Sequence, residues 1–380
     1  MSMNSLQLGF IGGAVDSAVG TTHKIACQMD QRWKLAAGCF STEPDINFHT
    51  AELWGIGKDR TYDSWQEFIE LEKDRLDAIS ILTPTPLHKE MVSACLDHNI
   101  PVVCEKSLTC KAQETKEIQN ELSSNQGFLA VTYNYTGYPM LRELRALIEE
   151  KKLGTINQIH IEMPQEGFLR LGKNNEKPRP QEWRLVDNTV PTLSLDLAVH
   201  IHQIVDFLIK QKPIELVALN NNFGFFENIV DNTMCIARYS GNIDCQIWFG
   251  KTALGHSNGL KVRVYGSEGS ATWFQLDPES IHLSDNLGKT YTIDKAFADL
   301  KIAGEERYSR FKAGHPAGFI EAFANYYYDI ADSLIAHKRQ GIHHSPWVCG
   351  ADTAYEGLLM LEAMATSAKN KSWAQVGILN

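Results

Sequence analysis

The sequence lacks the features that direct a chain into or across a membrane. No apolar run is long enough to span a bilayer, and Met1–Ser5 shows neither the basic nor the apolar block of a secretory signal peptide. The eight cysteines are scattered without a C-x-x-C pair, a pattern typical of reduced and mostly buried thiols. We therefore expect a cytoplasmic protein without a membrane partner.

An excess of positive charge is also missing. The formal net charge of −10 argues against a nucleic acid or an anionic membrane surface as partner, because both require a basic face. With 43% hydrophobic and 22% charged residues over 380 positions, the chain has the composition of a globular protein with a large core. Its length predicts two domains or one large domain.

A glycine-rich turn near the start of the chain is the strongest local feature. The apolar segment Leu6–Ala14 contains Gly12 and Gly13 and leads into residues 15–28, which we predict to be helical. A strand that enters a glycine turn and leaves as a helix directs backbone N–H groups toward one point, where a phosphate binds well. Ala14 replaces the second glycine of G-x-G-x-x-G and Gly20 comes late, so we expect an unusually long turn. An ordinary strand-to-helix turn would give a similar pattern.

Strand-like and helix-like segments alternate through residues 6–131 and predict a parallel sheet with right-handed crossovers. We predict strands at 35–40, 78–82, 102–104 and 128–131, and helices at 87–98 and 112–123. Ligands of such sheets bind at the carboxyl ends of the strands. The residues expected at those ends are Gly12, Ser41, Thr83 and Glu105.

The pattern changes after Asn134. We predict helices at 139–152, 193–209, 316–337 and 351–367, and strands at 156–163, 216–219, 232–239, 243–249, 261–265, 271–274 and 291–293. These strands, separated by glycine turns, predict an open and largely antiparallel sheet with helices on one face. The predicted fold class is thus an α/β Rossmann domain over 1–133 and an α+β domain over 134–380. We expect the second domain to bind substrate and to mediate oligomerisation.

Three groups of polar residues could carry chemistry. The segment Thr83–His88 (T-P-T-P-L-H) and the segment Glu105–Ser107 (E-K-S) each follow a predicted strand. Asp196 and His200 lie four residues apart in an apolar helix, which puts them about 40° apart around the axis. Two polar side chains inside an apolar helix require partners. A core pair that satisfies itself is the alternative to a functional site.

These motifs, in this order and spacing, resemble the Gfo/Idh/MocA oxidoreductases. The shared motifs are G-F-I-G-G at the N-terminus, T-P-T-P-L-H at 83–88, E-K-S at 105–107 in place of the family's E-K-P, Y-N-Y-T-G-Y-P at 133–139, D-x-x-x-H at 196–200 and G-H-P-A-G-F at 314–319. The last is like a motif of one subgroup. The resemblance implies a nicotinamide-dependent enzyme that oxidises or reduces a carbinol carbon of a sugar, sugar derivative or cyclitol.

The resemblance and the strand ends together give the candidate site. The candidate catalytic residues are Lys106, His200 and Asp196. The candidate cofactor contacts are Gly12, Gly13, Ala14, Ser41, Thr83, Pro84, His88, Glu105, Lys106 and Asn134. The candidate substrate contacts are Lys106, Trp183, Arg184, Asp196, His200 and His315. We predict no metal site, because no cysteine or glutamate is placed to complete one with Asp196 and His200.

Several of these residues have a plain structural alternative. Lys106 could be a solvated loop lysine, Glu105 its ion-pair partner, and Trp183 and Arg184 ordinary packing residues. His315 could cap the helix that follows it. His202 is expected in packing or at the surface, and His343 with His344 at the surface.

The sequence favours NAD over NADP as the cofactor. The usual ribose-binding carboxylate is absent at the end of the second strand, where Ser41 stands, but no Arg or Lys follows directly to hold a 2′-phosphate. An NAD-dependent glycosidase and a catalytically inactive nucleotide-binding sensor are the alternative functions. For assembly we predict a homodimer or homotetramer, with Ile243, Cys245, Ile247 and Phe249 on the sheet face that pairs with another copy.

Overall fold

A computed structural model describes residues 5–17, 19–341 and 345–377. The chain divides into two compact units, the first made of Met1–Gly137 with Phe319–Tyr355 and the second of Tyr138–Gly318 with Glu356–Asn380. From the sequence we predicted a boundary after residue 133, with all later residues in the second domain. In the structure, the later segment Phe319–Tyr355 belongs to the first unit. Among the residues described, no helix is both long and apolar enough to cross a bilayer.

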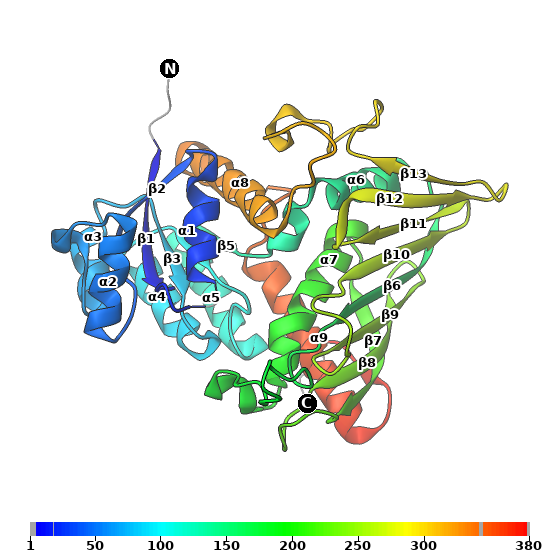
Figure 1. The fold of residues 1–380 in the computed structure, drawn as a ribbon, viewed down its shortest axis with the longest axis horizontal. Helices are drawn as coiled ribbons and strands as arrows, with labels where there is room; N and C mark the ends of the chain where they lie inside the picture. Colours follow the sequence, from blue (N-terminus) through cyan, green and yellow to red (C-terminus); the bar gives the residue numbers. More distant parts are fainter. Residues whose placement is uncertain (1–4, 18, 342–344, 378–380) are drawn as a thin grey trace. The chain divides into compact units, whose positions relative to one another are not determined.

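The first unit is built on a five-stranded parallel sheet in the order β2-β1-β3-β4-β5 (Figure 1). Its strands are β1 (Leu6–Gly12), β2 (Trp33–Cys39), β3 (Ala78–Leu82), β4 (Val102–Cys104) and β5 (Leu129–Val131). Its helices are α1 (Gly20–Met29), α2 (Pro44–Trp54), α3 (Trp65–Glu72), α4 (His88–Asp97), α5 (Ala112–Asn125) and α8 (Phe319–Gln340). Every residue of β3 and β4 is buried, as expected for short apolar strands covered on both faces. The predicted Rossmann sheet is confirmed.

Helix α8 joins the first unit from far along the chain, and it packs beside α1 (Figure 1). Phe323, Tyr327 and Ile330 of α8 belong to the same buried cluster as Leu8 and Phe10 of β1. The Trp33 indole N–H also donates a hydrogen bond to the backbone carbonyl of Tyr327 at 2.9 Å. The core of the nucleotide-binding sheet is therefore completed by residues that follow the whole second sheet in sequence.

The second unit contains a nine-stranded sheet in the order β13-β12-β11-β10-β6-β9-β8-β7-β14 (Figure 1). Its strands are β6 (Ile156–Pro164), β7 (Pro213–Asn221), β8 (Asn232–Tyr239), β9 (Ile243–Gly250), β10 (Lys261–Gly266), β11 (Gly269–Phe274), β12 (Asp277–Asp285), β13 (Thr290–Asp294) and β14 (Ala374–Gln375). Only the β6–β9 pair is parallel among these pairings, so the predicted open and mostly antiparallel sheet is confirmed.

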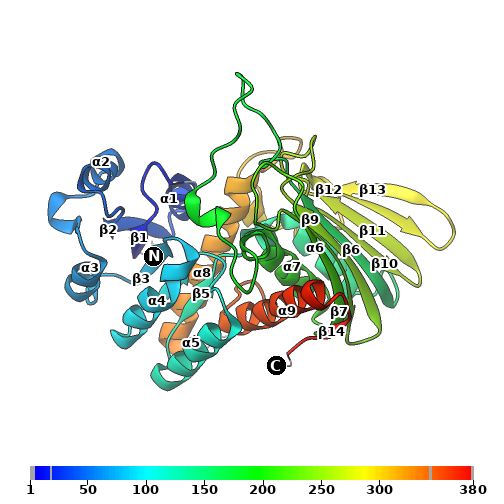
Figure 2. The ribbon, with the colours of Figure 1, turned by 90° about the horizontal axis from the view of Figure 1, so that it is seen from below.

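Helices α6 (Pro139–Glu149), α7 (Val199–Ile209) and α9 (Ala351–Asn370) lie along one face of this sheet (Figure 2). Ile243, Cys245, Ile247 and Phe249 are at most 5% exposed within this single chain. The prediction that these four side chains form an interface between copies is therefore wrong. Alternation along the strand showed that they share a face, but it could not show that the chain's own helices cover it.

Candidate functional site

The glycine turn at the end of β1 leaves no room for larger residues. Gly12 and Gly13 have φ angles of +78° and +75°, a backbone conformation that side chains with a Cβ rarely adopt. A Cβ on Gly20 would lie 1.8 Å from the carbonyl oxygen of Gly13. Helix α1 therefore begins at Gly20, packed directly against the turn, and not at residue 15 as predicted. The expectation of an unusually long turn is confirmed, because β1 ends at Gly12 and α1 begins only at Gly20.

This turn fits a dinucleotide phosphate. The N-cap of α1 is Val19, whose side chain makes no capping hydrogen bond, so the first backbone N–H groups of the helix have no side-chain acceptor there. Ala14 is buried, and its carbonyl oxygen accepts a hydrogen bond from the Ser17 amide at 2.8 Å. After β2, the Ser41 hydroxyl accepts a hydrogen bond from the Glu43 amide at 3.1 Å.

A buried side-chain amide after the end of β5 also supports a nucleotide-binding site. Asn134 is 2% exposed, and its side-chain Nδ2 atom has no hydrogen-bond partner among the described residues. A buried donor of this kind costs free energy unless a ligand or water accepts from it. Asn134 and the glycine turn both lie at the carboxyl edge of the parallel sheet, where nucleotides bind in this fold.

Glu105, the residue after β4, is enclosed in a polar network. Its Oε1 atom lies 3.1 Å from His23 Nε2 on α1, and the Thr132 hydroxyl donates to the same oxygen. Desolvation by itself would raise the pKa of Glu105, but the His23 hydrogen bond, the charges of His23 and Lys106 and the Thr132 hydrogen bond outweigh it and lower that pKa to about 2. Glu105 is thus an ionised carboxylate, and its hydrogen-bond partners His23 and Thr132 are buried in the protein interior.

His88 at the start of α4 is fully buried and joins two loops. Its Nδ1 atom lies 2.8 Å from the Ser107 carbonyl oxygen, and its Nε2 atom lies 2.7 Å from the Thr83 carbonyl oxygen. Burial lowers the pKa of this imidazole, although the carbonyl groups and Glu105 act in the opposite direction. These contacts support a role in holding the loops after β3 and β4, while Pro84 is exposed and Thr83 half-buried.

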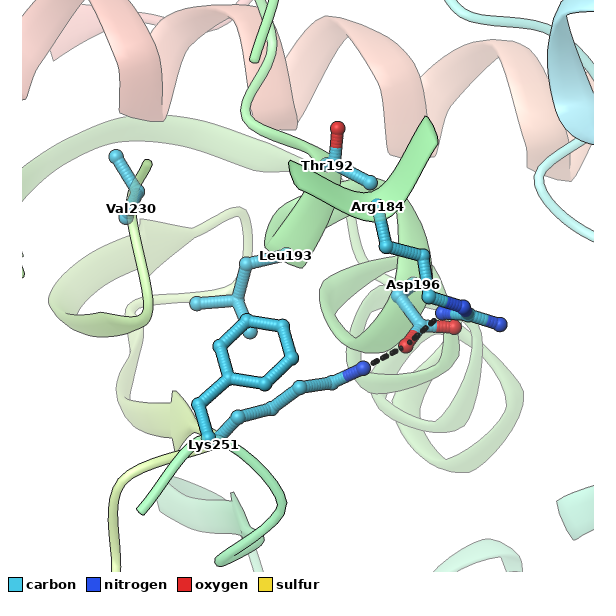
Figure 3. A pocket seen from close by; sticks show the side chains of 7 residues that line it. Arg184, Thr192, Leu193, Asp196, Val230 and Lys251 are labelled. Atoms are coloured by element: carbon cyan, nitrogen blue, oxygen red, sulfur yellow. Dashed lines mark hydrogen bonds and ion pairs between the residues drawn. The ribbon is translucent and has the colours of Figure 1, made fainter. Parts of the chain in front are cut away.

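In the second unit, a carboxylate faces two cations. The Oδ2 atom of Asp196 lies 2.8 Å from Arg184 Nη1 and 2.6 Å from Lys251 Nζ (Figure 3). All three side chains line one small pocket, together with Phe168, Thr192, Leu193 and Val230. Figure 3 shows the two cationic groups converging on the carboxylate from different segments of the unit.

Asp196 lies in a π-helical turn and not in a regular α-helix as predicted. The turn covers Ser194–Ala198, and α7 follows it without a break from Val199. His200 is the second residue of α7 and is 5% exposed. The estimate of about 40° between Asp196 and His200 assumed α-helical spacing, which this wider turn does not have. Turns of this kind occur often at functional sites.

The remaining candidates of the second unit lie on irregular segments. The Trp183 indole N–H donates to Gln181 at 3.1 Å, and the Arg184 guanidinium lies 4.4 Å from the Trp183 ring centroid. His315 is exposed, with Nδ1 3.2 Å from the Lys312 carbonyl oxygen. It does not cap α8, which begins only at Phe319. His343 and His344 lie outside the described residues.

The sequence interpretation missed three residues that contact the candidate groups. Lys251 follows β9 directly, and its position after a strand end was the one available signal. His23 and Thr132 carried no signal, because a contact between α1 and the end of β4 depends on tertiary packing. Among the residues described, no group of three or more His, Cys, Asp and Glu side chains is placed to hold a metal ion.

Comparison with known proteins identifies the family. Residues 6–133 match the oxidoreductase family with an NAD-binding Rossmann fold, and residues 141–272 match the GFO/IDH/MocA C-terminal domain. The chain belongs to the GFO/IDH/MocA oxidoreductases. This family member has an NAD-binding unit, and the expected fold, cofactor and enzyme class are confirmed.

Individual relatives span most of the chain. This family member is 27% identical to the uncharacterized oxidoreductase YfiI of Bacillus subtilis, with 97% of this chain and 96% of that protein aligned. It is 20% identical to levoglucosan dehydrogenase of Pseudarthrobacter phenanthrenivorans over 70% of this chain and 73% of that one. An inositol dehydrogenase homolog from Azotobacter vinelandii, crystallised with NADH and myo-inositol, has the same fold at a TM-score of 0.88, with 23% identity and 98% of each chain covered.

Proposed function

We propose that this family member transfers a hydride between NAD and a secondary hydroxyl of a sugar, sugar derivative or cyclitol. The observation that carries the proposal is the position of Lys106, half-buried in the loop after β4, at the carboxyl edge of the nucleotide-binding sheet. The substrate class is supported by levoglucosan dehydrogenase and the inositol dehydrogenase homolog among the relatives.

The first unit holds the cofactor in this proposal. The backbone of Gly12, Gly13 and Ala14 and the start of α1 take the pyrophosphate, Ser41 takes a ribose hydroxyl, and Asn134 donates to the nicotinamide end. Bound NAD supplies the hydride chemistry. The contacts of His88 and Glu105 with the protein interior support an indirect role for both side chains.

Side chains of the protein then stabilise the charge that develops on the substrate oxygen and accept the hydroxyl proton. The Lys106 ammonium stabilises negative charge that develops on the substrate oxygen. A ring nitrogen of His200 accepts the hydroxyl proton, because imidazole is the side chain that ordinarily titrates near neutral pH. Asp196, fixed by Arg184 and Lys251, accepts a hydrogen bond from a neighbouring substrate hydroxyl. In the competing assignment Lys106 is the base and His200 only holds substrate. In both assignments Trp183 and His315 are further substrate contacts.

A spectroscopic assay separates this function from its alternatives. The protein is mixed with NAD and with myo-inositol, levoglucosan, free sugars, uronates or aryl glycosides, and the absorbance of NADH is followed. A dehydrogenase accumulates NADH in proportion to the oxidised polyol. Release of an aglycone without net NADH would identify a glycosidase, and NAD binding without any turnover would identify a sensor.

We also propose that copies of this chain associate through the outward face of the nine-stranded sheet. Leu219 pairs in register with Met234 on that face, and both are at least half exposed, as is Ile236. A patch of apolar side chains on a sheet face without its own helices suits a second sheet. We expect Met234→Glu to convert dimers or tetramers to monomers in analytical ultracentrifugation. A wild-type monomer at micromolar concentration would contradict the proposal.

A cytoplasmic location is the last part of the proposal. All eight cysteines are described and none forms a disulfide, which is the usual state of thiols in a reducing compartment. Fractionation of the source cells would test it.

A further inference from the structure

Lys106 stands between two residues that the protein interior holds in place. Glu105 and Ser107 are 7% and 1% exposed, whereas Lys106 itself is half-buried. We propose that His23 and Thr132 on one side, and His88 on the other, are positioning residues that fix the backbone of Lys106. The inference rests on the proposed function for the role of Lys106, but the anchoring itself does not.

The upstream anchor acts on the Glu105 carboxylate. This ionised group can only accept hydrogen bonds, so the proton in the 3.1 Å contact must be on His23 Nε2. The other ring nitrogen of His23, Nδ1, lies 2.7 Å from the Tyr327 hydroxyl, which in turn lies 3.2 Å from the Ser80 hydroxyl. The hydrogen-bond directions are mutually consistent along this chain, and every member is buried.

Thr132 completes the upstream anchor from the end of β5. Its hydroxyl donates to Glu105, and its backbone amide donates to the Cys104 carbonyl oxygen at 2.9 Å. Thr132 therefore binds both Cys104, the last residue of β4, and the side chain of Glu105, the residue that follows it. Together with His23 on α1, this contact ties Glu105 to two separate elements.

The downstream anchor acts on the Ser107 backbone. His88 brings its two ring nitrogens to the carbonyl oxygens of Ser107 and Thr83 at 2.8 and 2.7 Å. The Ser107 hydroxyl donates to the Thr109 carbonyl oxygen at 2.8 Å, which further closes the loop. A neutral imidazole carries one N–H, so His88 donates a hydrogen bond to one of these carbonyl oxygens and packs against the other, and the buried ring lies between the loops after β3 and β4.

Both anchors limit where the base of the Lys106 side chain can lie. Lysine has a long side chain with many rotamers, so its ammonium reaches a defined point only if the backbone is fixed. A displacement of about 1 Å at a reacting group can cost about 10²-fold in rate. The anchors would therefore affect kcat through Lys106, without touching substrate or cofactor.

The test compares variants of the anchors with a matched variant elsewhere in the first unit. Thr132→Val removes the hydroxyl at nearly constant volume, Thr132→Ser keeps it, and His88→Leu removes the downstream bridge. The control is Tyr62→Phe, because the Tyr62 hydroxyl also donates to a buried carboxylate, that of Glu72, at 2.8 Å. Hydrogen exchange of the backbone amides in residues 104–109 is measured by mass spectrometry, and kcat and KM with a polyol that the wild type oxidises.

We expect Thr132→Val and His88→Leu to speed amide exchange in this loop by about tenfold or more, and to lower kcat by about 10–10². The KM for the polyol and the Kd for NAD should change by less than about threefold. Thr132→Ser should restore kcat, and Tyr62→Phe should change neither exchange in the loop nor kcat. Unchanged exchange in both anchor variants, or an equal loss of kcat in Tyr62→Phe, would overturn the proposal.

The two proposals fail separately. If the wild type oxidises no polyol, the proposed function fails, and the exchange measurement still decides whether the anchors hold the loop. If Thr132→Val does not fold, Tyr327→Phe takes its place, because it removes only the outer hydroxyl of the upstream anchor. Faster loop exchange in Tyr327→Phe would support the proposal, and unchanged exchange would contradict it.

Discussion

Lys251 and Arg184 bind the same oxygen of Asp196, at 2.6 and 2.8 Å. Lys251 follows β9, whereas Arg184 lies in the 3₁₀ turn Glu182–Leu185, so two distant segments orient one carboxylate. Because Asp196 keeps Arg184 when Lys251 is removed, loss of the lysine should weaken substrate binding without destroying the fold.

We expect Lys251→Met to raise KM about tenfold, with a smaller effect on kcat, and to cost roughly 1–3 kcal/mol of folding stability. The control is Lys295→Met, because Lys295 pairs with Glu279 at 3.6 Å with similarly low exposure in the same unit. Steady-state kinetics and urea unfolding measure the two effects. Equal changes of KM in both variants would show that the Asp196 cluster has no special role in binding.

The proton-transfer roles predict a second set of effects. Lys106→Ala and His200→Ala should each lower kcat by about 10²–10⁴, the usual scale for general acid–base groups, while NAD still binds. Asp196→Asn should lower kcat less and raise KM more. The pH profile of kcat identifies the base. If His200→Ala kept near-wild-type kcat with the profile intact, Lys106 would be assigned that role.

The close contact at Gly20 predicts a defect in cofactor binding. In Gly20→Ala the new Cβ would lie 1.8 Å from the Gly13 carbonyl oxygen, so the turn and the start of α1 must move apart. We expect NAD to bind at least about tenfold more weakly in calorimetric titration, because the phosphate site depends on both segments. Gly167→Ala is the control, since no atom lies within 4 Å of a Cβ at Gly167. Titration of the wild type with NADP tests the cofactor choice; tighter binding of NADP than of NAD would contradict it.

His202 predicts how stability depends on pH. Both ring nitrogens are buried without a hydrogen-bond partner among the described residues, and burial lowers the pKa of His202 to about 4. Between pH 6.5 and pH 4 the unfolded chain therefore binds a proton that the folded chain does not, and stability falls as the pH falls. From pH 7 to 4.5 this loss should be about 2 kcal/mol. The lowered pKa of Glu105 makes the folded protein less stable only below about pH 4.5.

His202→Leu should remove this part of the pH dependence. Urea unfolding at pH 7 and pH 4.5 should give a difference about 2 kcal/mol smaller for the variant than for the wild type. The exposed His49 on α2 provides the control, because His49→Leu should keep the wild-type dependence. An identical pH dependence in the wild type and in His202→Leu would contradict the burial of a neutral imidazole.

The sequence predicted most elements of the fold because their patterns are strong. The buried strand at 78–82 and the alternating strand at 232–239 were predicted with their observed bounds. Helices α2 and α3 and strand β12 were missed, because each mixes polar with apolar residues and is only partly buried. The assignment of the Ile243–Phe249 face failed for another reason. A strand's alternation defines two faces, and only tertiary structure decides which one the helices cover.

The candidate site was predicted in part. The backbone turn could be recognised, because its glycines are local requirements of the chain. The partners of Asp196 and Glu105 could not, since Lys251 and His23 lie 55 and 82 positions away in the sequence. Carboxylates removed from water need partners, but the sequence does not show which residues those partners are.

The place of α8 in the first unit has a consequence for biosynthesis. Tyr327 meets both His23 and the Trp33 indole, so the nucleotide-binding core lacks part of its interior until this helix has been made. A ribosome must translate the whole nine-stranded sheet except β14 before the first-made unit can close. We therefore expect nascent chains that end before residue 319 to expose an apolar surface beside α1. Such chains would depend on chaperones, although their N-terminal strands are already complete.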